Sequence, residues 1–525
     1  WGIGFKTADG IASKMGYEKN DPRRCRSGIL YTLNELAEEG HVYAEPEQLV
    51  DAAVKLLEAE ESPVRQALAS MIEANDVVLD NEVIYLPPFY YAENGSAKRL
   101  QSLLSDTSLF NAGIAAEPEA EYGAKTDGII YDGVQQAAIQ KALDSKVMVL
   151  TGGPGTGKTT TTQGIIAAFK ARHMSILLAA PTGRAAKRMT EATGMEAKTI
   201  HRLLEYNPMD GYKRNDENPL EGDALIVDEC SMIDILLFYN LMKAIPSKMR
   251  LILVGDIDQL PSVGAGNVLR DIIDSQQIPV VRLTRIFRQA QSSRIVMNAH
   301  AINAGQFPNI KNGFDTDFFF ISQEDADEIV KLIIGLVRDR LPKTYGYPSK
   351  EVQVLTPMQR GTVGAGNLNI ELQNALNPSG PSLARGGYTF RQGDKVMQIR
   401  NNYDKNVFNG DIGYITAVDT TERTLSITFD NRVVEYDITE LDEIVLAYAV
   451  TIHKSQGSEF PVVVMPVTMK HFVMLQRNLI YTGITRAKKI CVFVGTTKAL
   501  AYAIRNNTVT KRNTKLKERL NNGSL

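Results

Sequence analysis

The chain has 525 residues, too long for a single hydrophobic core, and this length predicts about three or four domains. Its 58 Lys and Arg residues nearly balance 61 Asp and Glu residues, and the net charge of −3 excludes a global positive field that would attract nucleic acid or an anionic membrane. Any polyanion must therefore bind in a local groove. Three widely separated cysteines form neither a disulfide framework nor a zinc cluster, which favours a reducing, cytoplasmic location. No apolar run reaches the roughly 18 residues of a membrane span.

The N-terminal part of the chain shows helical periodicity. Stretches such as GILYTLNELAEEGH and PEQLVDAAVKLLEAE place apolar residues at i, i+3 and i+4. We therefore expect a helical region over residues 1–120. The chain opens with WGIGF, as if within a motif, so we also expect that its natural N-terminus is missing.

The remainder reads as α/β structure with one insertion. Short, wholly apolar runs (VMVL, SILLAA, ALIVDE, LILVGD) alternate with helical stretches, as in parallel sheets that are buried on both faces. They predict a first α/β domain over residues 121–290, and VQVLTPM, FPVVVMPV and KICVFVG predict a second over 291–387 and 446–525. Residues 388–445 alternate with period two between turn signals, which predicts an inserted antiparallel barrel. We expect the basic C-terminal tail to be frayed.

GGPGTGKT fits the phosphate-loop pattern G-x-x-x-x-G-K-[ST] and stands between a predicted strand and a predicted helix. Backbone N–H groups of such a loop converge on phosphate oxygens at a helix N-terminus. Lys158 would reach the β- and γ-phosphates, and the Thr159 hydroxyl would bind Mg²⁺. A glycine-rich turn without a ligand is the alternative. The predicted nucleotide contacts here are Gly153, Pro154, Gly155, Thr156, Gly157, Lys158, Thr159 and Thr160.

Polar residues follow the next predicted strands. Asp228 ends ALIVDECSM and can hold Mg²⁺ through water, while Glu229 beside it can polarise the attacking water. Two solvated acids are the alternative. Gln259 follows the strand LILVGD, where it can sense a γ-phosphate.

A series of motifs in a fixed order carries a family resemblance. GGPGTGKTTT, APTGRAA, TIHRLL, IVDECSM, GDIDQLPSVGAG, LTRIFRQ, YAVTIHKSQGSEF and NLIYTGITRAKK cover about residues 130–500. They resemble superfamily-one DNA helicases, and within these the RecD-like 5′-to-3′ branch. GIGFKTADGIASKMG resembles half of the helix-hairpin-helix in the longer, stand-alone RecD-like type. The resemblance implies an α/β fold with two RecA-like P-loop domains in tandem, ATP in the cleft between them, a helical N-terminal domain and an inserted SH3-like β-barrel.

The resemblance also assigns nucleotide contacts. Gln136 occupies the place of a glutamine that reads adenine, and Glu459, close to Gly457, that of a residue on the ribose. Arg288 and Arg486 match arginines that reach the γ-phosphate from the second domain and stabilise the transition state.

The octet RLTRIFRQ contains Arg288 and no acidic residue, and charges are rarely buried without a partner. We expect the γ-phosphate to be the partner of Arg288, with an acid elsewhere in the fold as the alternative. Arg285 remains unassigned.

Further motifs are candidate grips on a nucleic-acid strand, with a structural role as the alternative for each residue. Threonine and arginine side chains can donate to phosphates, and histidine or methionine can pack on bases or sugars. Residues 206–223 resemble the hairpin pin that splits a duplex in RecD-like helicases; a plain surface loop is the alternative. The predicted DNA contacts are Pro181, Thr182, Gly183, Arg184, His201, Thr356, Met358, Asn409, Thr451 and His453.

We therefore expect an ATP-dependent DNA helicase that uses ATP and Mg²⁺, moves 5′ to 3′ on single-stranded DNA and unwinds forked duplex DNA in repair or recombination. We expect a monomer, with single-strand-binding protein as a candidate partner. The main alternative is a DNA-dependent ATPase that binds or remodels DNA without processive unwinding. A kinase or metabolic P-loop enzyme is disfavoured by the duplicated domain and ordered arginines. The helicase part of a conjugative relaxase is disfavoured because no relaxase histidine cluster precedes the motor.

Overall fold

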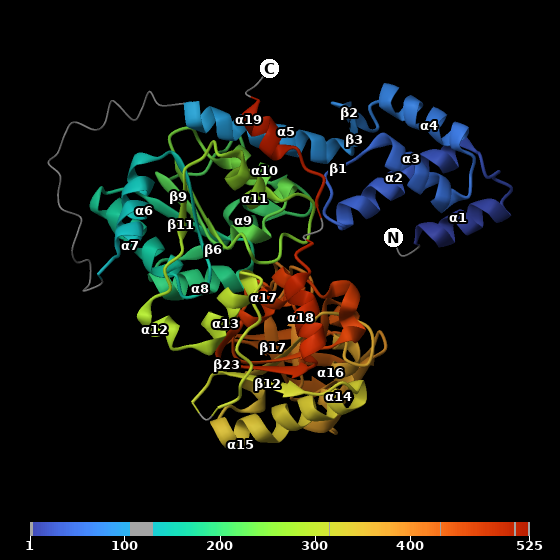
Figure 1. The fold of residues 1–525 in the computed structure, drawn as a ribbon. Helices are drawn as coiled ribbons and strands as arrows, with labels where there is room; N and C mark the ends of the chain where they lie inside the picture. Colours follow the sequence, from blue (N-terminus) through green and yellow to red (C-terminus); the bar gives the residue numbers. More distant parts are fainter. Residues whose placement is uncertain (1–3, 106–129, 314, 431, 509–510, 523–525) are drawn as a thin grey trace.

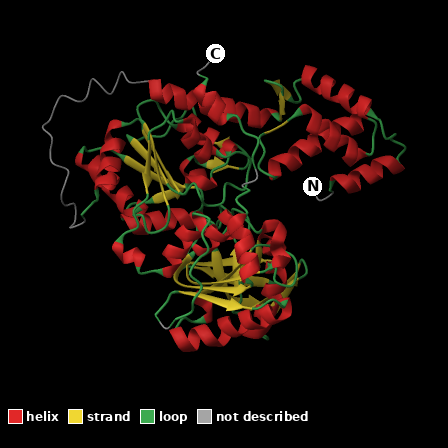
Figure 2. Ribbon diagram, in the orientation of Figure 1, coloured by secondary structure: helices red, strands yellow, loops and turns green. Residues whose placement is uncertain are grey.

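Two parallel α/β sheets form the centre of the molecule, one above the other in Figure 1. Helices cover both faces of each sheet (Figure 2), and the N-terminal helices lie to one side of the first sheet. None of the described helices is both long and apolar enough to cross a membrane. The computed structural model describes residues 4–105, 130–313, 315–430, 432–508 and 511–522, and their side chains except those of Arg288 and Gln289.

The N-terminal region is a group of helices with a small three-stranded antiparallel sheet in the order β1-β3-β2. Its core contains fully buried apolar side chains such as Ile29, Leu49 and Val64. Asp21 caps the second helix by accepting a hydrogen bond from the Arg23 N–H group. The elements are α1 (Phe5–Lys14), α2 (Pro22–Glu38), β1 (Tyr43–Ala44), α3 (Pro46–Leu57), α4 (Glu61–Glu73), β2 (Val78–Asp80), β3 (Val83–Tyr85) and α5 (Pro87–Ser105).

The first α/β unit has a six-stranded sheet in the order β11-β4-β10-β9-β5-β6, with every pair parallel. Its central strands are buried along almost their whole length, as the apolar runs predict. Parallel strands end at one edge, so the loops after β4, β9 and β10 meet there. The elements are α6 (Gly133–Asp144), β4 (Val147–Gly152), α7 (Lys158–Ala171), β5 (Ile176–Ala180), α8 (Gly183–Thr193), β6 (Ala197–Thr199), α9 (Ile200–Leu203), β7 (Tyr206–Asn207), β8 (Gly211–Tyr212), β9 (Ala224–Val227), η1 (Cys230–Met232), α10 (Ile235–Ala244), β10 (Arg250–Gly255), α11 (Val268–Ser275) and β11 (Val280–Leu283).

The second α/β unit has a five-stranded parallel sheet in the order β12-β23-β22-β13-β21. Its first two helices lie against the phosphate loop of the first unit, where a Cβ on Gly155 would be 2.7 Å from the Cβ of Ala290. The elements are α12 (Arg288–Gln291), α13 (Arg294–Asn303), β12 (Phe318–Ser322), α14 (Ala326–Gly335), η2 (Leu336–Arg340), α15 (Leu341–Tyr345), η3 (Ser349–Glu351), β13 (Val352–Thr356), α16 (Ala365–Leu376), β21 (Ala449–Thr451), η5 (His453–Ser455), β22 (Phe460–Val467), η6 (Met469–Met474), α17 (Arg477–Ile484), β23 (Ala487–Gly495) and α18 (Thr497–Arg505).

An antiparallel β-structure is inserted between α16 and β21. Five strands pair in the order β19-β18-β17-β16-β20, and a hairpin, β14–β15, precedes them. Alternate residues of β18 are buried, which explains the period-two pattern of the sequence. The hairpin starts at Ser382, ahead of the expected start at residue 388. The elements are β14 (Ser382–Arg385), β15 (Tyr388–Arg391), β16 (Lys395–Gln398), β17 (Ile412–Asp419), β18 (Thr424–Phe429), β19 (Arg432–Asp437), η4 (Ile438–Glu443) and β20 (Ile444–Leu446).

The C-terminal tail contradicts the expectation of fraying, because it contains an ordered helix, α19 (Leu516–Asn521). Leu516 and Leu520 are 1% and 3% exposed, and they join the core of the first α/β unit. The basic composition of the tail hid this i, i+4 leucine pair, which forms the apolar face of a short helix. In Figure 1, α19 lies beside α5, far from α18 in the second unit.

Candidate nucleotide cleft and DNA-facing surface

The phosphate loop lies in a cleft of about 450 Å³ that both α/β units line. Lys158 begins α7, and its Nζ donates to the carbonyl oxygen of Gly153 at 3.1 Å. Gly157, just before it, has a φ of 83°, a left-handed conformation that favours glycine. The cleft brings together predicted residues from distant motifs: Gly153, Pro154, Gly155, Gly157, Lys158, Thr159, Thr160, Asp228, Glu229, Gln259, Glu459 and Arg486.

Two carboxylates follow β9 at the edge of the cleft. Asp228 Oδ1 accepts a hydrogen bond from the Glu229 N–H group at 2.8 Å. Burial and the charge of Glu229 raise the pKa of Asp228 to about 6. Burial alone would raise the pKa of Glu229 as well, but the charges of Arg188, Arg486 and Lys158 hold it below its ordinary value. Of the two carboxylates, Glu229 is the one whose ionised form the surrounding positive charges favour.

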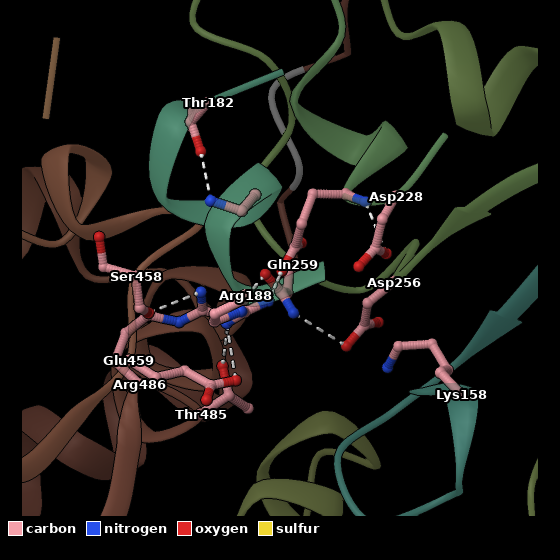
Figure 3. Close-up of polar contacts among 12 residues, drawn as sticks. Lys158, Thr182, Arg188, Asp228, Asp256, Gln259, Ser458, Glu459, Thr485 and Arg486 are labelled. Carbon is pink, nitrogen blue, oxygen red and sulfur yellow. Dashed lines mark hydrogen bonds and ion pairs between the residues drawn. The ribbon is translucent and has the colours of Figure 1, made fainter. Parts of the chain in front are cut away.

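Arg188 joins the two units across the cleft, and sequence reasoning missed it. Its guanidinium lies 2.8 Å from Glu229 of the first unit. It also lies 2.7 Å from Glu459 of the second unit, and both Arg188 and Glu459 are labelled in Figure 3. Lys488 is a second partner of Glu459 at 3.3 Å. The sequence did contain a signal for Arg188. It lies four residues after the predicted Arg184 on α8, and it therefore shares the same face of the helix.

Arg486 is the second link between the units. It is 2% exposed, its Nη2 donates to Gln259 Oε1 at 2.9 Å and its Nη1 to the Ser458 carbonyl oxygen at 3.1 Å. Gln259 Nε2 in turn donates to Asp256 Oδ2 at 3.3 Å, and the hydroxyl of Tyr481 donates to the same oxygen at 2.7 Å. A displacement of Gln259 would therefore disturb its hydrogen bond to Arg486 of the second unit.

Three of the predicted nucleotide residues, Gln136, Thr156 and Gly457, do not line the cleft. Gln136 is exposed and donates to the Tyr131 carbonyl oxygen at 3.0 Å, whereas its neighbour Gln135 is 2% exposed and faces Gly157. Thr156 is buried, and its hydroxyl donates to the Gly153 carbonyl oxygen at 2.8 Å, which stabilises the loop itself.

Gly457 lies at the contact between the two units, where an added Cβ would be 2.6 Å from Thr182 Oγ1. Arg288 is the first residue of α12, and its side chain lies outside the described part of the structure. The unassigned Arg285 is exposed and lies 3.7 Å from Asp132.

A second groove, of about 720 Å³, lies between α8, the insertion and the start of β22. Gly183 and Arg184 are the predicted DNA contacts that line it. The Arg184 guanidinium lies 5.7 Å from the centre of the Phe460 ring, and burial lowers its pKa although Asp411 is near. The groove is basic on balance, as expected of a local anion site in a chain of low net charge. Its basic lining residues are Arg184, Lys187, Arg188, Lys198, Arg202, Lys350, Lys395, Arg432 and Lys488.

The other predicted DNA contacts do not line this groove. For Thr356 the structure contradicts the prediction. Thr356 is fully buried, and its hydroxyl donates to the Val363 carbonyl oxygen at 2.7 Å, so it is not available to a phosphate. Thr182 caps α8 through the Ala185 N–H group at 3.2 Å. Asn409 is exposed, whereas Pro181, Met358, Thr451 and His453 are half-buried.

His201 packs against the short hairpin β7–β8, which occupies the start of the expected pin. Its ring centre is 5.6 Å from that of Tyr206 and 5.9 Å from that of Tyr212. The hairpin tip carries Met209, which is 94% exposed. Leu220, by contrast, is 4% exposed and belongs to the core, so it anchors the later part of segment 206–223 in the first unit.

Four family models match separate parts of the chain. The ATP-dependent RecD2 DNA helicase HHH domain matches residues 1–43, and an AAA domain matches residues 135–265. The ATP-dependent RecD-like DNA helicase SH3 domain matches residues 368–429, and the UvrD-like helicase C-terminal domain matches residues 446–494. The predicted fold class, with two α/β units, a helical N-terminal region and an SH3-like insertion, is therefore confirmed.

Individual proteins extend this likeness. The ATP-dependent RecD2 DNA helicase of Deinococcus radiodurans is 34% identical over 539 residues, which cover 99% of this chain and 72% of that protein. The RecBCD enzyme subunit RecD of Mycobacterium tuberculosis is 30% identical, over 84% of this chain and 81% of that protein. A solved structure from work on DNA unwinding at forked duplexes by two coordinating Pif1 helicases has a TM-score of 0.44 at 20% identity, covering 70% of this chain and 92% of that one. Because its sequence follows the first of these relatives over nearly its whole length, the chain belongs to the family of ATP-dependent RecD2-like DNA helicases.

Proposed function

We propose that this helicase moves 5′ to 3′ along single-stranded DNA, unwinds the duplex ahead of it, and acts in DNA repair or recombination. The cleft between the two α/β units is the observation that carries the proposal. Lys158, Glu229 and Gln259 enter it from one unit, and Arg486 and Glu459 from the other. A ligand that binds between two bodies and changes its charge on hydrolysis can bias them between closed and open states.

In this proposal each residue has one task. Lys158 leaves the loop carbonyls and binds the β- and γ-phosphates, and Glu229 accepts a proton from the attacking water. Arg486 and Arg288 stabilise negative charge that develops on the γ-phosphate from the second unit. Gln259 accepts a hydrogen bond from Arg486 at 2.9 Å, and it transmits the presence of the γ-phosphate to that arginine.

The oxygen ligands of the cleft fit Mg²⁺. Thr159 and Asp228 lie in it together, and the described residues contain no group of three or more His, Cys, Asp or Glu side chains that could enclose a metal. Mg²⁺ usually takes one or two protein oxygens and completes its shell with phosphate oxygens and water. We propose that Thr159 binds the ion directly and Asp228 through water, and the ion would neutralise phosphate charge.

The basic groove and the short hairpin supply the DNA contacts in this proposal. Arg184 and the other cations of the groove would hold backbone phosphates, and the exposed tip of the hairpin would meet the duplex at the fork. Tyr206 of the hairpin lies 6.1 Å, centre to centre, from the Tyr403 ring of the insertion. The insertion is therefore in contact with the element that would separate the strands.

A comparison of 5′-tailed and 3′-tailed duplexes tests the proposed polarity. We expect ATP-dependent unwinding of the 5′-tailed substrate alone. Preference for the 3′ tail would refute the polarity. ATPase activity stimulated by single-stranded DNA, without unwinding of either substrate, would instead support the alternative, a DNA-dependent ATPase that remodels DNA. The buried, unpaired cysteines agree with the proposed cytoplasmic location, and sedimentation with and without DNA tests the proposed monomer.

A further inference from the structure

The C-terminal strap, residues 511–522, returns from the second α/β unit to the first unit and the N-terminal region. In Figure 1 it rises from the second unit to reach α5 at the opposite end of the molecule. The Lys515 N–H group donates to Glu93 Oε1 at 2.7 Å, and the Val42 N–H group donates to the Asn513 carbonyl oxygen at 2.8 Å. Arg519 forms ion pairs with Asp80 at 2.6 Å and Glu93 at 3.4 Å. Fixed contacts therefore hold the strap along its described length.

Arg512, near the start of the strap, binds one loop of the first unit. Its Nη1 donates to Ser262 Oγ at 3.1 Å and to the carbonyl oxygens of Gly264 and Gly266 at 3.0 and 2.6 Å. Its Nη2 donates to the Ser262 carbonyl oxygen at 2.7 Å. A planar guanidinium with donors in a fixed fork imposes its geometry on the carbonyl groups it binds. These four hydrogen bonds thus determine the path of residues 262–266.

The same loop begins in the nucleotide cleft. Gln259 is three residues before Ser262. Between them, the Leu260 N–H group donates to Thr482 Oγ1 at 2.9 Å, and the Leu260 carbonyl oxygen accepts from Gln456 Nε2 at 2.9 Å. The segment is therefore attached to the second unit at Leu260 and to the strap at Ser262. A shift of Gln259 would therefore strain the hydrogen bonds at Leu260 or those at Ser262.

Gly40 of the N-terminal region closes the other side of Arg512. Its φ is 98°, and a Cβ at this position would collide with the Arg512 guanidinium. The Gly40 carbonyl oxygen accepts a hydrogen bond from the Gly266 N–H group at 3.0 Å. The N-terminal region, the strap and the loop thus meet at one guanidinium.

We propose that Arg512 is a positioning residue for ATP hydrolysis, which acts through the 262–266 loop on Gln259. The inference rests on the proposed role of Gln259 in the cleft. Arg512 holds Gln259 at the distance from Arg486 that catalysis requires, and the docked N-terminal region keeps Arg512 in place. Loss of the guanidinium releases the loop, so Gln259 samples positions from which it cannot respond to the γ-phosphate.

The test compares Arg512→Ala, Gln259→Ala and the double variant by their DNA-stimulated ATPase kinetics. We expect Arg512→Ala to lower kcat about tenfold, as small displacements of catalytic groups do. KM for ATP should stay within about twofold, because the phosphate loop is untouched. If Arg512 acts through Gln259, the double variant has the kcat of Gln259→Ala alone, whereas independent effects multiply.

A second variant and a matched control separate positioning from stability. Gly40→Ala pushes the guanidinium away without removing it and should reproduce the kcat loss of Arg512→Ala. Arg24→Ala is the control, because Arg24 also makes four hydrogen bonds, to Asp9, Lys19 and Leu57 in the N-terminal region. It should lower the unfolding temperature and leave kcat unchanged.

The outcomes distinguish the proposed role of Arg512 from the proposed role of Gln259. Unchanged kcat in folded Arg512→Ala, with slow Gln259→Ala, overturns the positioning role and leaves the role of Gln259 intact. Normal turnover of Gln259→Ala overturns both. Multiplied losses in the double variant would show that Arg512 acts independently of Gln259. A similar kcat loss in Arg24→Ala would show that Arg512 acts through general stability. Either result would overturn the inference.

Discussion

Replacing Arg188 by methionine should make ATP hydrolysis abnormally sensitive to acid. Methionine keeps much of the apolar stem but removes the charge that lies 2.8 Å from Glu229. Glu229 is 7% exposed and would retain the influence of Arg486 and Lys158 alone. An opposite charge within about 4–6 Å shifts a carboxyl pKa by about 1–3 units, and because Arg188 is 25% exposed we take the lower half of that range.

The expected shift is therefore an increase of about 1–2 units in the pKa of Glu229, or about 1.4–2.7 kcal/mol. A base works only when deprotonated, so the acid limb of the kcat profile should move upward by the same amount. The assay is steady-state, DNA-stimulated ATPase activity at saturating ATP between about pH 5.5 and 8.5. We expect a loss of at most about threefold near pH 6, a larger loss toward pH 5.5, and no measurable loss near pH 8.

Lys170→Met is the matched control for this experiment, since Lys170 lies exposed in the last turn of α7. Its pH profile should equal that of the wild type. The reasoning would be refuted by a folded Arg188→Met enzyme whose acid limb coincides with the wild-type limb. A loss of kcat by one factor at every pH would instead assign Arg188 to the closure of the cleft through Glu459.

Four shorter predictions follow from the structure. Lys158→Ala should abolish ATPase activity and leave single-strand binding largely intact in a filter or anisotropy assay; retained turnover would sink the phosphate-site assignment. Arg288→Ala should bind nucleotide normally and hydrolyse it about 10³-fold more slowly, and normal single-turnover rates would contradict its role as a finger. Replacing residues 208–210 by glycines should preserve DNA-stimulated ATPase activity but reduce fork unwinding, because the tip projects while Leu220 stays in the core; equal unwinding would remove the pin. Lys395→Met tests the pH dependence of stability. Burial lowers the pKa of Lys395 to about 7 in the folded protein. In the unfolded chain the side chain stays charged up to about pH 10, so the folded state disfavours the charged form. Wild-type stability should therefore gain up to about 2 kcal/mol relative to Lys395→Met between pH 7 and 9, as measured by urea unfolding, and parallel curves would contradict this.

Much of the cleft could be predicted from local sequence. The phosphate loop requires glycines in left-handed conformations directly before a helix, and that requirement is visible in GGPGTGKT. Wholly apolar runs predicted buried parallel strands, and such strands bring their C-terminal ends to one edge. Lys158, Asp228 and Gln259 could therefore be placed together without any knowledge of long-range contacts.

Other features depended on which surfaces meet. Thr356 sits in a motif that suggests a phosphate donor, yet tertiary packing buries it and pairs its hydroxyl with Val363. The adjacent glutamines 135 and 136 look alike in sequence, but the face of α6 that packs on the phosphate loop buries only the first. A pattern reports the face on which a residue lies, and it does not report what covers that face.

The sequence by itself determined the parallel sheets, the phosphate loop and the order of the motifs, because these follow from backbone conformation and periodicity within short segments. Only the tertiary structure decided that Arg188 joins Glu229 to Glu459, and that the strap carries Arg512 to the loop after Gln259. The contacts of Arg188 with Glu459 and of Arg512 with Ser262 join residues more than 200 positions apart. Their partners are chosen by the packing of whole units, where each buried charge must find an opposite charge or a hydrogen-bond acceptor.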